Sequence, residues 1–189
     1  MNIVEEAIVF ATSAHEGQTR RKSQIPYIVH PMEVASIIAT ITDDLKTIAA
    51  GILHDTVEDC GVDPEELRAK FGDDVAEIVL GESEEVGLSG SRSDTWLYRK
   101  QKSIDDLRAT TDKRIKILWL ADKLANIRSF HRLYLKDKDK MWEPFHQKDP
   151  KVQLWYYKEI LDCLSEFKGT LAYTELEEKI KIIFGEYYE

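Results

Sequence analysis

With 189 residues, the chain is long enough for one domain with a sizeable core and too short for two ordinary domains. Apolar residues make up 43% and charged residues 32%, which is typical of a globular protein, and no apolar run approaches the roughly 20 residues of a membrane span. The formal net charge of −9 opposes binding along the phosphates of long nucleic acids.

The N-terminal residues and the cysteine content favour a reducing compartment. The first residues lack the basic and apolar segments of a secretory signal, and only Cys60 and Cys163 are available to pair. We therefore expect a cytoplasmic protein that does not enter a membrane. A small phosphorylated substrate is compatible with the charge if a metal ion and the basic cluster at residues 20–22 invert the local potential.

The apolar periodicity predicts helices along most of the chain and no convincing alternating strand. Pro31 suits a first helical turn, which places His30 at the mouth of the second helix. The third helix is apolar nearly all round at residues 48–53 and is therefore expected to be central. The predicted helices span about residues 2–15, 30–42, 44–57, 64–70, 73–81, 94–109, 112–135, 150–167 and 170–184. These elements predict an all-α fold, a helical bundle that forms a single domain over residues 1–189.

Two segments between the predicted helices are polar. Residues 82–93 contain two glycines and four serines, which favours a mobile loop that could act as a lid. Residues 136–140 carry mixed charge and are expected to form a solvated turn.

A histidine and an acid end the central apolar helix. Burying His54 beside Asp55 would cost several kcal/mol unless something compensated both groups, and a divalent cation would do so. A helix-terminal ion pair, or a core histidine with its hydrogen bonds satisfied, is the alternative for this dipeptide alone.

The position of Asp122 also favours a bound cation. On a helical projection it shares a largely apolar face with Leu118 and Ala125, so its carboxylate is expected to point into the core. His30 can supply a second imidazole beside His54. Two imidazoles and two carboxylates suit Mn²⁺, Fe²⁺, Zn²⁺ or a related ion.

Glu58 and Asp59 lie four residues after His54 and Asp55. If the helix continues, they project from the same face one turn further on and would overhang the metal ion. A carboxylate pair there could perform general acid-base catalysis. The alternative is an acidic, solvated helix end, which the helix dipole disfavours.

Several motifs occur together and in order. They are His15-Glu-Gly-Gln18, Arg21-Lys-Ser23, Pro26-Tyr-Ile-Val-His-Pro31, His54-Asp-Thr-Val-Glu-Asp59, Phe71-Gly72 and Leu120-Ala-Asp-Lys-Leu-Ala-Asn-Ile-Arg128. Over about residues 5–130, the sequence resembles the HD-type hydrolase domain of RelA/SpoT-like proteins. The chain has no room for the synthetase and regulatory domains of the long members, so the likeness is to small, hydrolase-only members such as metazoan SpoT homologues.

The resemblance implies an all-α HD domain and a Mn²⁺-dependent enzyme of the stringent response, which removes the 3′-diphosphate from the alarmones ppGpp and pppGpp. It implies metal ligands at His30, His54, Asp55 and Asp122, and a catalytic acidic pair at Glu58 and Asp59. It further implies contacts with the guanine nucleotide at Arg21, Lys22 and Ser23, and a contact near the sugar at Asn126.

The segment between Phe71 and Asp122 departs from the family pattern, because it carries an unusually acidic loop. Two alternatives therefore stay open: an HD phosphohydrolase that acts on NADPH or another nucleotide, and a nucleotide-sensing module with little turnover. The aromatic residues after about residue 132 lie outside the resemblance. On their helical spacing they are expected to pack in the core or at the interface of a homodimer rather than to stack on a base.

Overall fold

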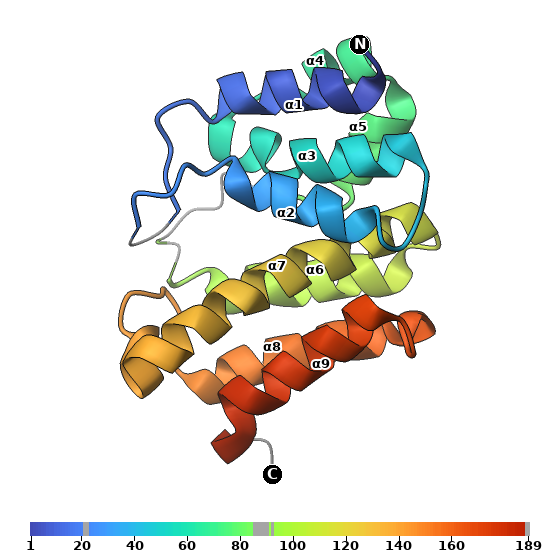
Figure 1. Cartoon of the computed structure of the whole chain (residues 1–189). Helices are drawn as coiled ribbons and strands as arrows, with labels where there is room; N and C mark the ends of the chain where they lie inside the picture. The colour runs from blue at the N-terminus through green and yellow to red at the C-terminus, as the bar shows by residue number, and fades with distance from the viewer. Residues whose placement is uncertain (21–22, 85–90, 92, 188–189) are drawn as a thin grey trace. The chain divides into compact units, whose positions relative to one another are not determined.

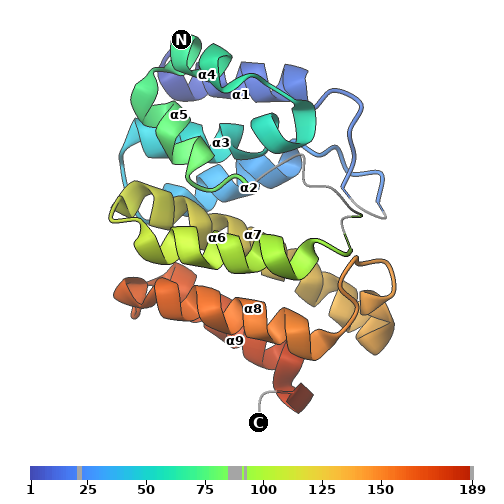
Figure 2. The same ribbon diagram turned by 180° about the vertical axis from the view of Figure 1, so that it is seen from behind.

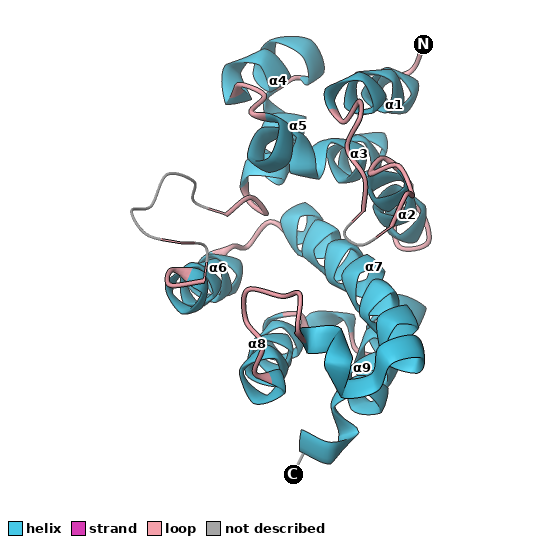
Figure 3. Ribbon diagram, turned by 90° about the vertical axis from the view of Figure 1, so that its left-hand side faces the viewer, coloured by secondary structure: helices cyan, strands magenta, loops and turns pink. Residues whose placement is uncertain are grey.

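In the computed structural model, the structure describes residues 1–20, 23–84, 91 and 93–187. Within these residues the elements are helical, and the one extended pairing is an isolated bridge between Thr19 and Pro26 (Figure 3). The all-α fold class is thereby confirmed. Among the helices of the described part, none combines the length and the apolar character needed to cross a bilayer.

The chain divides into two compact units. Unit 1 comprises Met1–Glu84 with Thr110–Asp122, and unit 2 comprises Glu85–Ala109 with Lys123–Glu189. Unit 1 contains α1 (Ile3–Ala14), α2 (Val29–Ile38), α3 (Leu45–Cys60), α4 (Pro64–Phe71), α5 (Asp73–Leu80) and the start of α7 (Lys113–Asp137). Unit 2 contains α6 (Trp96–Ala109), the rest of α7, η1 (Lys138–Trp142), α8 (Pro150–Cys163), η2 (Ser165–Phe167), α9 (Leu171–Phe184) and η3 (Gly185–Tyr187).

Two helix ends in unit 1 differ from the predicted ones. Helix α2 ends at Ile38 rather than near residue 42, because the Thr40 hydroxyl donates to the Ile37 carbonyl and competes with the helical hydrogen bonds. Helix α3 continues to Cys60 instead of ending near residue 57. It ends at Gly61, whose left-handed φ of 69° is readily adopted by glycine.

The two polar segments, residues 136–140 and 82–93, were predicted to be a surface turn and a mobile loop. Helix α7 runs through Asp137 and is followed directly by η1, so residues 136–140 are helical rather than a turn. Most of the predicted mobile segment, residues 85–90 and 92, lies outside the described residues.

Helix α3 is the centre of unit 1, as its apolar sequence predicts. It packs against α1, α2 and α5, and residues 49–54 are all buried (Figures 1 and 2). Gly51 allows the close approach of α2, because a Cβ atom at this position would lie 2.4 Å from Ile38 Cδ1. The side chains of Val34 and Ile38 on α2 are fully buried against this contact.

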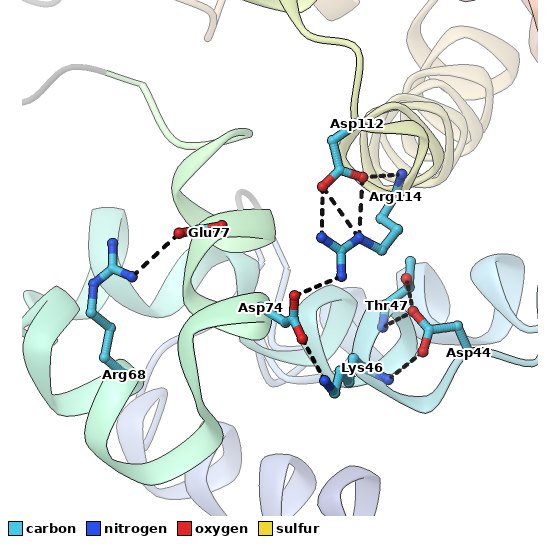
Figure 4. Close-up of polar contacts among 8 residues, drawn as sticks. All are labelled: Asp44, Lys46, Thr47, Arg68, Asp74, Glu77, Asp112 and Arg114. Carbon is cyan, nitrogen blue, oxygen red and sulfur yellow. Dashed lines mark hydrogen bonds and ion pairs between the residues drawn. The ribbon is translucent and has the colours of Figure 1, made fainter.

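An ion-pair network joins the starts of three helices of unit 1 (Figure 4). Asp112 lies just before α7 and accepts from the guanidinium of Arg114 at 3.1 and 2.8 Å. Arg114 also donates to Asp74 of α5 at 3.0 Å, and Asp74 pairs with Lys46 of α3. Because the four charged side chains are connected in one network, they fix the start of α7 better than an isolated surface ion pair would.

Unit 2 has an aromatic core. Helix α8 packs against α6 and α9 (Figure 2). Phe130 lies edge-on to Trp142, Phe145 and Tyr157, and Trp142 stacks on Phe184 at 5.3 Å. Trp142 and Tyr157 are buried, so both pack in the core as predicted.

The close contact at Gly51 gives a test of the packing. We expect Gly51→Val to lower the free energy of unfolding by about 1–3 kcal/mol, because the added atoms must displace buried side chains of α2. Gly185→Val is the matched control, since no atom lies within 4 Å of a Cβ at that glycine. Equal denaturant midpoints for the two variants would contradict the packing argument.

Candidate metal centre

Three helices of unit 1 bring two imidazoles and two carboxylates together. His30 lies in the first turn of α2, His54 and Asp55 lie in α3, and Asp122 lies in α7. The exposed fractions of His30, His54 and Asp122 are 3%, 1% and 3%, while Asp55 is half-buried. Since α3 extends to Cys60, His54 and Asp55 stand more than a turn before its end, not at the end as predicted.

Each imidazole faces both carboxylates through its Nε2 atom. His30 Nε2 lies 3.1 Å from Asp122 Oδ1 and 3.5 Å from Asp55 Oδ2. His54 Nε2 lies 3.0 Å from Asp55 Oδ2 and 3.6 Å from Asp122 Oδ1. The two rings meet edge to face, with centroids 5.3 Å apart. Four potential ligand atoms from three helices therefore face a common point.

The hydrogen bonding of His54 fits a metal ligand. Its Nδ1 atom bonds to the Gly51 carbonyl at 2.9 Å, which assigns the ring proton to Nδ1 and leaves a lone pair on Nε2. His54 Nε2 and His30 Nδ1 are buried and have no hydrogen-bond partner among the described residues. With the ring proton on Nδ1, the Nε2 lone pair of His54 faces the carboxylate oxygens of Asp55 and Asp122 at 3.0 and 3.6 Å, and a cation between these atoms would remove their repulsion.

The charges of the site stabilise one another. Burial raises the pKa of Asp55, but the His54 and His30 imidazoles outweigh burial and hold that pKa well below its usual range. Burial lowers the pKa of His54, but Asp55 and Asp122 outweigh it and raise that pKa, so the carboxylates favour positive charge at Nε2, which a proton supplies in the absence of a metal ion. Asp55 is therefore held in the ionised form, which is the form that binds a cation.

The donor set suits a divalent metal ion. Ligand atoms of His30, His54 and Asp122 all lie within 4.8 Å of one another, which is close enough to coordinate one ion. The Asp55 carboxylate belongs to the same group, because its Oδ2 atom lies 3.5 Å from Nε2 of His30 and 3.0 Å from Nε2 of His54. Imidazole and carboxylate donors together favour Mn²⁺, Fe²⁺ or Zn²⁺ over Ca²⁺, which prefers oxygen ligands alone.

The acidic pair lies on the same helix as two of these ligands. Because α3 continues to Cys60, Glu58 and Asp59 stand one helical turn beyond His54 and Asp55, as the sequence predicts for a continuous helix. Glu58 is half-buried and Asp59 is exposed.

The predicted nucleotide contacts are only partly described. Arg21 and Lys22 lie outside the described residues. The Ser23 hydroxyl donates to the Arg20 carbonyl at 3.1 Å and accepts from the Ile25 amide at 3.2 Å, so it shapes a turn. Asn126 follows Asp122 by one turn in α7 and belongs to unit 2. The roles assigned to these residues from the sequence stay predictions.

Three neighbours of the centre were quoted in the motifs, yet the sequence assigned no role to them. The Tyr27 hydroxyl donates to Asp55 Oδ2 at 2.7 Å, and the Tyr27 ring stacks on His15 at 4.8 Å. Gln18 bonds through its amide oxygen to His15 Nδ1 at 2.8 Å. The bond between Tyr27 and Asp55 joins residues far apart in sequence, and His15, Gln18 and Tyr27 lie after the end of α1, so helical periodicity carries no signal for these contacts.

Comparison with known proteins agrees with this geometry. The family model for the HD domain matches residues 7–148. Guanosine-3′,5′-bis(diphosphate) 3′-pyrophosphohydrolase of Vibrio cholerae is 40% identical over 131 residues, which are 69% of this chain and 18% of that protein. GTP pyrophosphokinase of Myxococcus xanthus is 34% identical over 138 residues, 70% of this chain and 18% of its own length.

A solved structure extends the likeness to nearly the whole chain. It is described as a metazoan ortholog of SpoT that hydrolyses ppGpp and plays a role in starvation responses. It is 27% identical, has a TM-score of 0.74, and the alignment covers 98% of this chain and 96% of that one. The resemblance inferred from the motifs is thus confirmed, and since the HD-domain model matches more than half of its length, the chain belongs to the HD-domain family.

Proposed function

We propose that this chain is a Mn²⁺-dependent phosphohydrolase that removes the 3′-diphosphate from ppGpp and pppGpp. The observation that carries the proposal is the buried group of His30, His54, Asp55 and Asp122, in which His54 Nε2 has no hydrogen bond among the described residues. This donor set suits a divalent cation, and hydrolysis of phosphate esters is a reaction that divalent ions promote.

The comparisons support the substrate. The chain spans only 18% of the length of the two curated relatives, which therefore contain much more than this domain. The solved structure has nearly the same extent as this chain, and its description states that the protein hydrolyses ppGpp. We propose that residues 1–189 act as one hydrolase domain.

In this proposal His30, His54, Asp55 and Asp122 hold the ion, which supplies Lewis-acid chemistry at the scissile phosphate when bound. Glu58 or Asp59 accepts a proton from the attacking water on a carboxylate oxygen and returns it to the leaving oxygen. These two acids suit the role because they are accessible and lie one helical turn from the ligands on α3.

The remaining groups bind the nucleotide. Arg21 and Lys22 supply positive charge that offsets the net charge of −9, and Ser23 and Asn126 supply neutral polar contacts. We propose cytoplasmic action on a free nucleotide, without a nucleic-acid or membrane partner. Formation of a homodimer stays a prediction that analytical ultracentrifugation would test.

A substrate panel tests the assignment. Purified protein loaded with Mn²⁺ is expected to convert ppGpp to GDP and diphosphate, and to lose this activity in excess chelator. Assays of pGpp, NADPH and GTP under the same conditions measure selectivity. Faster turnover of NADPH than of ppGpp would favour the alternative phosphohydrolase. Nucleotide binding with intact metal and without turnover would favour a sensing module.

Loss of a ligand is expected to remove metal and activity together. We expect His54→Ala and Asp122→Ala each to reduce the bound metal far below one ion per chain, because each change removes one of four donors. Metal content by mass spectrometry and ppGpp turnover are measured on the same preparation. A full complement of metal with wild-type turnover in either variant would refute the ligand set.

Neutralising the acidic pair is expected to separate binding from catalysis. Glu58→Gln combined with Asp59→Asn keeps side-chain size but removes the ability to accept a proton. We expect kcat to fall by roughly 10² to 10⁴, while metal stays bound and nucleotide affinity is unchanged or tighter. Tighter binding would follow from the loss of repulsion between the carboxylates and the incoming phosphates.

The matched control removes the same charge elsewhere in unit 1. Asp43 and Glu66 are exposed, and Asp43→Asn combined with Glu66→Gln is expected to leave kcat near the wild-type value. Single-turnover rates and nucleotide affinities on metal-loaded protein compare the two double variants. Near-wild-type rates for the Glu58 and Asp59 variant would contradict the catalytic role and favour the alternative, in which both residues are solvated acids at the end of a helix.

A further inference from the structure

Asp55 has a neighbour that the proposed chemistry does not use. The Tyr27 hydroxyl donates to Asp55 Oδ2 at 2.7 Å. The same oxygen lies 3.0 Å from His54 Nε2 and 3.5 Å from His30 Nε2. Tyr27 therefore bonds to the oxygen of Asp55 that faces the imidazoles. A carboxylate oxygen can accept this bond on one lone pair and keep the other for a cation.

The contact is a short hydrogen bond between a hydroxyl and a carboxylate. The distance of 2.7 Å between the Tyr27 hydroxyl and Asp55 Oδ2 is typical of an O–H donor on a carboxylate oxygen, and such charge-assisted bonds are stronger than bonds between neutral groups.

The ring of Tyr27 is held between two imidazoles. One face stacks on His15 at a centroid distance of 4.8 Å, and the ring meets His30 edge to face at 5.9 Å. Arg20 lies 5.4 Å from the centroid of the same ring. The Tyr27 amide donates to the Gln18 carbonyl at 2.9 Å, so the backbone of the loop is fixed beside the ring.

The supporting residues are in turn bonded to the end of α3. His15 is buried, and its Nδ1 atom lies 2.8 Å from the Gln18 amide oxygen and 3.1 Å from Cys60 Sγ. The Gln18 amide nitrogen donates to the Asp59 carbonyl at 3.1 Å. The loop that carries Tyr27 is therefore attached to the helical turn that contains the acidic pair.

We propose that Tyr27 is a positioning residue of the metal centre, which fixes the ligand oxygen of Asp55 through its hydroxyl while His15 holds its ring and Gln18 holds its backbone. The inference rests on the proposed metal site, but not on the identity of the nucleotide. Hydrogen bonds of this kind orient a ligand before the ion arrives, and their loss typically weakens metal binding 10- to 100-fold.

The test is the affinity of chelator-stripped protein for Mn²⁺, measured from the electron paramagnetic resonance signal of the free ion. Tyr27→Phe keeps the ring and removes only the hydroxyl, and we expect it to weaken Mn²⁺ binding about 10- to 100-fold while the circular dichroism spectrum stays that of the wild type. Tyr156→Phe is the matched control. Its hydroxyl is buried in unit 2 without a hydrogen bond among the described residues, so Mn²⁺ affinity should not change.

A double-mutant cycle distinguishes positioning from a general structural effect. In an Asp55→Ala background the hydroxyl has lost its acceptor, so adding Tyr27→Phe should leave the Mn²⁺ affinity unchanged. Equal weakening in both backgrounds, or wild-type affinity in the single variant, would overturn the proposal.

Parallel assays of ppGpp turnover separate this inference from the proposed function. If Tyr27→Phe weakens Mn²⁺ binding but the wild-type protein does not hydrolyse ppGpp, the inference stands and the substrate assignment fails. If the wild-type protein hydrolyses ppGpp and Tyr27→Phe binds Mn²⁺ as the wild type does, the substrate assignment stands and the inference fails.

Discussion

Two carboxylates and two imidazoles converge inside unit 1, and the electrostatic cost of this convergence constrains the structure around it. Removing charged groups from water costs several kcal/mol for each group unless other charges or hydrogen bonds compensate. Here the imidazoles stabilise the ionised carboxylate of Asp55, and Nε2 of His54 lies 3.0 Å from one oxygen of that carboxylate. A cation at the point that the four side chains face would compensate the carboxylates and bind Nε2 of His54. The helices that supply the groups must then be held accurately in place.

The packing of α3 provides much of this accuracy. The helix supplies two of the four groups and lies against α1, α2 and α5. Gly51 has a double effect, since its missing side chain lets α2 approach and its carbonyl orients the His54 ring. Both α2 and α3 contribute a histidine, so one glycine influences the separation of the two imidazoles and the direction of one of them. The network of Asp112, Arg114, Asp74 and Lys46 fixes α7 relative to α3 and α5, which in turn places Asp122.

All four candidate ligands belong to one compact unit, and so do the acidic pair and the loop that contacts them. The order of these residues along α3 separates their environments. His54 is fully enclosed, Asp55 is half-buried, and Asp59 is exposed at the last turn. A single helix therefore leads from the enclosed donors to groups that water and a phosphorylated substrate can reach. This gradient suits a hydrolase, because metal ligands gain from exclusion of water whereas proton-transfer groups must reach it.

The sequence by itself determined the helical class and most helix positions, and it predicted the metal ligands. Apolar periodicity identified α3 as central and Asp122 as an acid on an apolar face, and the motifs resembled those of the HD family. Local hydrogen bonds that compete with the helix moved the end of α2, and Gly61 set the end of α3, which periodicity alone does not locate to the residue. Only the tertiary structure showed that Tyr27 bonds to Asp55 and that His15 and Gln18 connect its loop to the end of α3. These contacts depend on the distances between helices and loops. Periodicity reports which face of a helix is buried, but it does not report which side chains from distant segments meet there.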